Sequence, residues 1–99
     1  MVRLHRLALR EFHEARCWYL QRSNSAGERF RDAVREAIRA IAGDPRLPAA
    51  DQDGMRWWKA KRFPYLLHYY IVDQNEIHIY AVAHERRRPG YWKRRLNSP

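Results

Sequence analysis

The sequence has little of the material that several classes of protein require. Its 99 residues include a single cysteine, Cys17, so no disulfide can form within the chain. No apolar run approaches the roughly 18 residues of a transmembrane helix. The opening residues, MVRLHRLALREF, lack the unbroken apolar segment of a secretory signal peptide. These absences disfavour disulfide-rich and membrane proteins, and they predict a cytoplasmic protein that has no membrane partner.

The usual motifs for metals and nucleotides are also missing. The five histidines are scattered, and neither H-x-x-x-H nor C-x-x-C spacing occurs. No glycine-rich loop is present to hold a phosphate. We therefore expect no metal and no cofactor, and zinc chemistry and nucleotide hydrolysis are disfavoured.

Acidic residues are scarce, which leaves a formal net charge of +9. Residues 1–55 hold ten arginines against eight acids, whereas residues 56–99 hold ten basic residues against three acids. The second half therefore carries most of the positive charge, interleaved with aromatic residues. This pattern favours an acidic partner, either nucleic acid or an acidic protein, although a solvated basic surface stays possible.

The first half reads as a short strand followed by two helices. Residues 2–5 alternate in polarity, and residues 7–22 follow a helical period with Ala8, Phe12, Ala15 and Tyr19 on one stripe. Residues 23–25 interrupt the helix, and residues 25–28 fit a capping box for a second one that ends at residues 43–45. The apolar face of that second helix consists of Phe30, Val34, Ala37, Ile38 and Ile41.

The second half reads as three strands and a short basic end. Strands are predicted over residues 55–60, 65–72 and 76–83, with a turn at 73–75. Residues 91–96 suit one or two helical turns. The expected fold is a single α+β domain over residues 1–99, in the order β-α-α-β-β-β, with the helical hairpin on one face of a small sheet.

Alternation along the hairpin of residues 65–84 predicts which side chains share a face. With Asp73 opposite Glu76, Tyr65 would lie opposite His84. The face expected beneath the helices carries Leu66, His68, Tyr70, Val72, Ile77, Ile79, Ala81 and Ala83. The opposite face, expected to be open to a partner, carries Tyr65, Leu67, Tyr69, Ile71, His78, Tyr80, Val82 and His84.

The end of this hairpin holds residues that suit metal-free RNA cleavage. Such a reaction needs a base for the 2′-hydroxyl proton, a cation near the phosphate and an acid for the leaving oxygen. His84 could transfer protons, Arg86, Arg87 and Arg88 could hold phosphate, and Tyr91 could donate a proton or stack on a base. Packing or partner binding explains the same residues equally well.

Several segments together resemble the RelE/ParE superfamily of bacterial toxins from type II toxin–antitoxin systems. The segments are Trp18-Tyr19 in a helical hairpin, Arg62-Phe63-Pro64-Tyr65, and the stretch AVAHERRRPGYW from Ala81 to Trp92. The likeness covers nearly the whole chain and lies closest to the ParE-like, plasmid-stabilisation branch. It implies the same element order, with the hairpin packed on one side of an antiparallel sheet.

The resemblance implies two possible targets. ParE-like members poison DNA gyrase by protein contact, which makes a growth-inhibiting toxin the first hypothesis. RelE-like members cleave messenger RNA within the ribosome, and the candidate catalytic residues carried over are His84, Arg87, Tyr91, Lys59, Lys61 and Arg62. A third hypothesis is a nucleic-acid-binding module without toxicity.

The resemblance also implies a cognate antitoxin that wraps the domain and forms an oligomer with it. The basic half would attract the acidic residues of the antitoxin, and exposed aromatic side chains would anchor it. The candidate partner-binding residues are Trp57, Tyr65, Tyr69, Tyr80, Arg86, Arg88 and Trp92.

Overall fold

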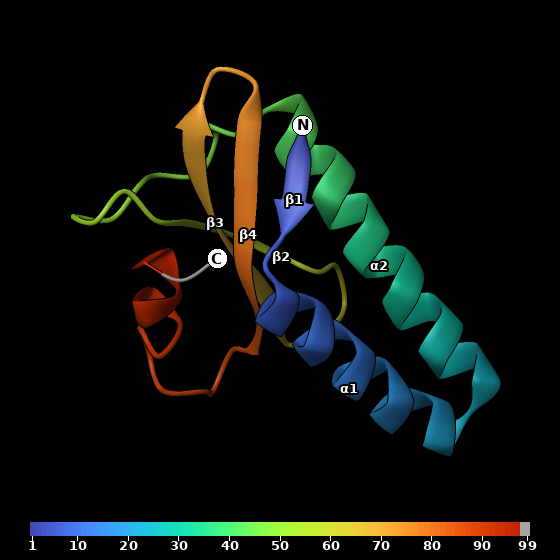
Figure 1. Ribbon diagram of the computed structural model, residues 1–99. Helices are drawn as coiled ribbons and strands as arrows, with labels where there is room; N and C mark the ends of the chain where they lie inside the picture. Colours follow the sequence, from blue (N-terminus) through green and yellow to red (C-terminus); the bar gives the residue numbers. More distant parts are fainter. Residues whose placement is uncertain (98–99) are drawn as a thin grey trace.

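The computed structural model describes residues 1–97 as two helices packed on one face of a four-stranded sheet (Figure 1). The elements are β1 (Val2–Leu4), α1 (Arg6–Arg22), α2 (Asn24–Gly43), β2 (Arg56–Lys59), β3 (Tyr65–Asp73), β4 (Glu76–His84) and the 3₁₀ helix η1 (Lys93–Asn97). The predicted α+β fold and its element order are confirmed. The spatial order of strands is β1-β4-β3-β2, and β1 runs parallel to β4. The sheet is therefore mixed, and only β2, β3 and β4 are antiparallel.

The two helices meet at a sharp junction. The Ser23 backbone is extended, and its side chain accepts a hydrogen bond of 2.9 Å from the Ala26 N–H, so Ser23 caps α2. The predicted capping box at Ser25 was therefore two residues too late. Glu28 instead forms ion pairs with Arg16 and Arg31. A one-residue junction thus produces the predicted antiparallel hairpin.

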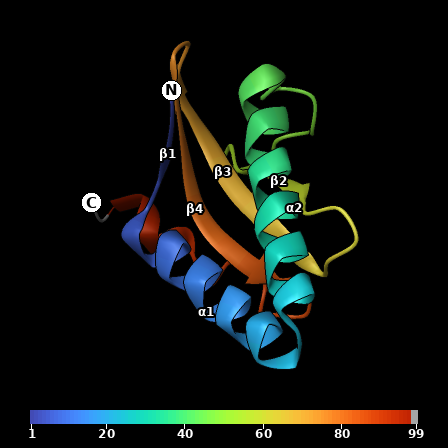
Figure 2. The ribbon, with the colours of Figure 1, turned by 90° about the vertical axis from the view of Figure 1, so that its right-hand side faces the viewer.

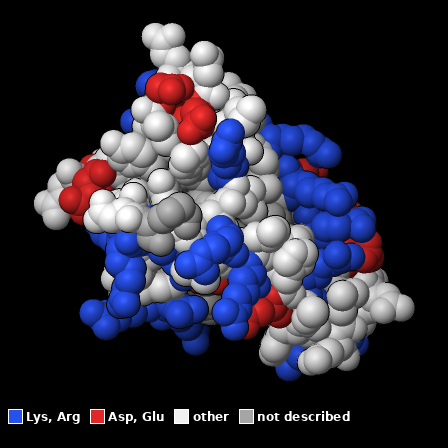
Figure 3. All heavy atoms as spheres, in the orientation of Figure 1, with Lys and Arg blue, Asp and Glu red and all other residues white. Residues whose placement is uncertain are grey.

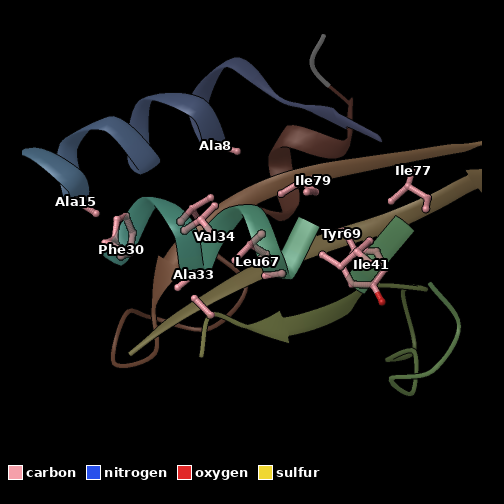
Figure 4. Close-up of a cluster of buried hydrophobic side chains, with 13 residues drawn as sticks. Ala8, Ala15, Phe30, Ala33, Val34, Ile41, Leu67, Tyr69, Ile77 and Ile79 are labelled. Carbon is pink, nitrogen blue, oxygen red and sulfur yellow. The ribbon is translucent and has the colours of Figure 1, made fainter. Parts of the chain in front are cut away.

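The main core lies between the helices and the sheet (Figure 4). The predicted apolar faces are confirmed, since Ala8 and Ala15 of α1 and most of the predicted α2 stripe are buried there. The sheet contributes large side chains to this core: Leu67, Tyr69, Ile77, Ile79 and Val82.

The prediction of which β3 side chains face the helices was wrong. Leu67 and Tyr69 are fully buried beneath the helices, whereas His68 points to the opposite face, where it stacks on Trp92. The Tyr69 hydroxyl donates a 2.7 Å hydrogen bond to the Pro45 carbonyl, so its polar end is satisfied inside the core. Tyr65 and Ile71 also pack on the helix side.

Two register shifts explain the mixed result on β4. Val72 on β3 and Tyr80 on β4 are each an extra residue in the ladder. Because the shifts compensate, the predicted pairs Tyr65–His84 and Asp73–Glu76 are present at the two ends. Between Tyr80 and the turn, Ile77 and Ile79 face the helices as predicted. Beyond Tyr80 the prediction is reversed, because Val82 faces the helices while Ala81 and Ala83 face the other side of the sheet.

The second face of the sheet is covered by the C-terminal segment, residues 90–97. A second cluster there buries Met55, Tyr80, Ala81, Ala83 and Trp92. Figure 2 shows this segment and α2 on opposite sides of the sheet. Both faces of β3 and β4 are consequently buried, although different parts of the chain cover them. Neither α-helix in the described part of the chain is long and apolar enough to cross a membrane.

Candidate partner-binding cleft

A cleft of about 560 Å³ opens between α1 and the ends of β3 and β4. One wall is aromatic, because Tyr19 and Tyr65 line it and both belong to a cluster of rings that includes Phe30 and Phe63. Burial raises the pKa of both tyrosine hydroxyls. The complete lining is Glu11, Glu14, Ala15, Trp18, Tyr19, Pro64, Tyr65, Val82, His84 and Arg87.

Trp18 forms the exposed rim of this cleft. Its side chain is 49% exposed, and the Arg22 guanidinium lies 3.3 Å from the centre of its ring. Arg22 also donates a hydrogen bond to the Trp18 carbonyl, which fixes the pair on the last turns of α1. An exposed, oriented indole beside aromatic walls suits a protein contact, since such side chains anchor interfaces at low entropic cost.

Glu11 ties the cleft to the C-terminal segment. Its carboxylate accepts hydrogen bonds from the Val82 N–H (3.0 Å), from both terminal nitrogens of Arg95 (3.0 and 3.1 Å) and from the Tyr91 hydroxyl. Arg95 also donates to the Tyr80 carbonyl at 2.8 Å. Glu11 and Arg95 therefore form hydrogen bonds with backbone groups at the edge of β4, in the part of that edge that β1 does not reach. The ion pair is largely shielded from solvent, because each side chain is 11% exposed.

This arrangement engages Tyr91, one of the predicted catalytic residues. Its hydroxyl is bonded to Glu11, and the guanidinium groups of Arg87 and Arg95 lie 4.0 and 5.1 Å from its ring centre. Burial, followed by the hydrogen bond to Glu11, raises the pKa of the Tyr91 hydroxyl well above its usual value. Tyr91 is thus held as a structural contact in this structure.

The other predicted catalytic residues are divided between different surfaces. His84 and Arg87 share the α1 cleft, and the His84 ring accepts a 3.1 Å hydrogen bond from the Arg86 N–H. Lys61 and Arg62 line a separate hollow against α2, and Lys59 is exposed on β2. Arg62 has a φ of 71°, in the left-handed region. The structure does not gather the six residues into one site.

The predicted partner-binding residues also divide. Trp57 is 54% exposed and lies over another hollow, whereas Trp58 packs on the main core. Arg86 and Arg88 are exposed, and Tyr65 is half-buried in the cleft wall. The remaining three side chains, Tyr69, Tyr80 and Trp92, are buried within the chain, which corrects their expected exposure. The reason is the reversed face of β3 for Tyr69 and the covering C-terminal segment for Tyr80 and Trp92.

Sequence reasoning missed Glu11 and Arg95. Glu11 lies one turn from both Ala8 and Ala15, so it borders the apolar stripe of α1. A carboxylate at the edge of a buried stripe signals a hidden partner, but nothing in the sequence identifies that partner as Arg95. Among residues 1–97, no three His, Cys, Asp or Glu side chains are grouped so that they could hold a metal ion.

Comparison with known proteins gives a family. The family described as "ParE toxin of type II toxin-antitoxin system, parDE" matches residues 2–89. Among solved structures, a chain of the chromosomal ParDE toxin–antitoxin system from P. aeruginosa is similar, with a TM-score of 0.60 and 15% identity. The match covers 84% of this chain and 92% of that one. No match was found among curated proteins. The chain therefore belongs to the ParE toxin family, within the RelE/ParE superfamily.

Proposed function

We propose that this toxin inhibits growth by protein contact with DNA gyrase and that a cognate antitoxin neutralises it. The membership of the ParE toxin family supports a toxin role. The engagement of Tyr91 by Glu11 is the observation that most favours a protein target over RNA cleavage, because a cleaving enzyme needs its proton donor free. The division of the remaining candidate catalytic residues between surfaces points the same way.

The α1 cleft is the proposed antitoxin site. Its aromatic wall and Trp18 would receive an apolar anchor, and Arg87 and His84 in its lining would attract an acidic residue of the antitoxin. Glu14 on the same lining would disfavour a phosphate backbone. Trp57, on the opposite face of the sheet, is left available for the target.

The target can be tested with purified gyrase and with translated messages. The expected result is gyrase-dependent DNA breaks in the presence of the toxin, without new 5′ ends on messenger RNA. Codon-linked RNA ends without DNA breaks would contradict a gyrase target. Expression in bacteria provides the control for toxicity, because the absence of a growth defect without antitoxin would contradict any toxin role.

The antitoxin site can be tested with the two exposed tryptophans. Trp18→Ala should weaken antitoxin binding by about tenfold or more, since the loss of a central aromatic anchor typically exceeds 1–2 kcal/mol. Trp57→Ala, a matched control of similar exposure on the other face, should leave the affinity within about threefold. Isothermal titration calorimetry gives both values. A larger loss of affinity for Trp57→Ala than for Trp18→Ala would mean that the antitoxin binds the face of the sheet opposite the helices.

A further inference from the structure

A groove of about 530 Å³ lies between β1 and the 3₁₀ helix η1, away from the α1 cleft. Four basic side chains line it: Arg3, His5, Arg6 and His78. Among residues 1–97, no carboxylate lines this groove. In contrast, the α1 cleft contains Glu11 and Glu14, and the hollow beneath Trp57 contains Asp51. The groove is therefore a cationic concavity, whereas the α1 cleft and the hollow beneath Trp57 have mixed charge.

Arg3 and Arg6 are the cations that are free to receive a ligand. Both are exposed, and within residues 1–97 neither forms an ion pair with an acid. The two histidines are already engaged, since the Nδ1 of His5 accepts from the Leu7 N–H and His78 contacts Glu76 at 2.6 Å. The two arginine side chains consequently give the groove its preference for an anionic ligand.

Positive charge continues outside the groove along one side of the molecule. Arg94 is exposed on η1, and Arg86 and Arg88 are exposed on the loop that leads to it. Figure 3 shows basic side chains gathered over this C-terminal region. Because α1 begins at Arg6 and has no acid in its first turn, the positive end of its dipole adds to the same field. A ligand carrying several anionic groups in a row would match this distribution better than a single anion.

We infer that this groove and the arginines beside it bind the phosphate backbone of duplex DNA. Guanidinium groups bind phosphate oxygens in a forked geometry, and protein–DNA interfaces are more polar and more positively charged than protein–protein interfaces. An acidic protein would need an apolar centre, and the groove offers no exposed large apolar side chain. Single strands are held by stacking on exposed aromatic rings, whereas Tyr80 and His5 in the groove are buried. The inference goes beyond the proposed target and does not depend on it.

The test measures the anisotropy of a fluorescein-labelled duplex of arbitrary sequence at several salt concentrations. The double variant Arg3→Gln/Arg6→Gln should bind about tenfold more weakly. The magnitude of the slope of log affinity against log salt should fall by about 1.8, because each of the two lost phosphate contacts contributes ~0.9. The matched control is Arg35→Gln/Arg39→Gln, which removes the same charge from exposed positions on α2. The control should stay within about threefold.

Four outcomes would overturn the inference. Equal weakening by both double variants would mean that total charge alone drives binding. Binding of polyglutamate as tightly as the duplex would assign the groove to an acidic protein, and tighter binding of the unpaired strand would exclude the duplex. If far-UV circular dichroism shows that the groove variant is unfolded, Arg3→Gln alone, on β1, should still lower the salt slope by about 0.9. An unchanged slope in that variant would also overturn it.

Discussion

Glu11 accepts hydrogen bonds from β4 and from two side chains of the C-terminal segment. It joins α1 to the edge of β4 and to the C-terminal segment through one largely buried carboxylate. A buried ion pair adds little stability over an apolar pair of the same shape, but the loss of one partner leaves an uncompensated charge. Glu11 is therefore important because its removal leaves the guanidinium of Arg95 without its carboxylate partner.

We predict that Glu11→Gln lowers the free energy of unfolding by about 3–5 kcal/mol, because Arg95 loses its carboxylate in a site where both side chains are 11% exposed. Urea denaturation followed by tryptophan fluorescence measures this loss. Glu14→Gln is the control, since Glu14 is 68% exposed and its pair with Arg10 should be worth less than about 1 kcal/mol. Equal effects of the two substitutions would contradict the role given to Glu11.

His68 gives a second prediction at this scale, because its ring is buried against Trp92 at a centroid distance of 3.5 Å. Burial lowers the pKa of His68 from 6.5 to about 4, while Glu11 and Asp51 act weakly in the opposite direction. The unfolded chain therefore takes up this proton first as the pH falls. Stability contributed by neutral His68 should be complete above pH 6.5 and decline towards pH 4, by up to about 3 kcal/mol.

The measurement for His68 is the pH dependence of the urea midpoint. Other groups titrate in the same range, so the difference between the native chain and His68→Phe isolates this residue. The phenylalanine variant keeps a ring against Trp92 but cannot bind a proton. Parallel pH profiles for the two proteins would contradict the prediction.

At the scale of the elements, the sequence predicted the helices well because each has one apolar stripe and one polar face. The strands of the hairpin lack that contrast. Both faces of β3 and β4 are buried, so apolar side chains alternate with tyrosine and histidine, and no polar face indicates which side meets the helices. The shifts at Val72 and Tyr80 reverse the alternation locally and leave no mark in the sequence.

The junction of the helices provides a prediction for an element boundary. Ser23→Ala should lower the free energy of unfolding by about 1 kcal/mol, because the Ala26 N–H loses its capping oxygen. Ser25→Ala should have a smaller effect, since the Ser25 hydroxyl accepts its hydrogen bond from the exposed side chain of Arg29. Thermal unfolding by circular dichroism compares the two variants. A larger loss of stability for Ser25→Ala than for Ser23→Ala would mean that Ser25 caps α2, as the sequence predicted.

The whole molecule depends on a segment that the family match does not reach. The match ends at residue 89, whereas the second face of the sheet is covered by residues 90–97. The sequence predicted that this segment exists and is helical, but the contacts that dock it cannot be read from local patterns. Trp92 meets His68 and Arg95 meets Glu11 across long separations in the chain. Such pairings depend on tertiary packing, which is why they were absent from the expected site.

A chain that ends at Pro89 should therefore lose cooperative folding. It would expose Met55, Tyr80 and the alanines of β4, and it would leave Glu11 without Arg95. The Trp92 side chain alone should contribute about 3–5 kcal/mol, a large part of the total for a small domain. Near-ultraviolet circular dichroism and binding of the dye ANS report the loss of fixed packing.

Trp92→Ala should show a weaker form of the same change, and Trp57→Ala, which removes an exposed indole, should not. A truncated chain with an unchanged, cooperative urea transition would mean that the first core folds by itself and that the C-terminal segment is only an added surface.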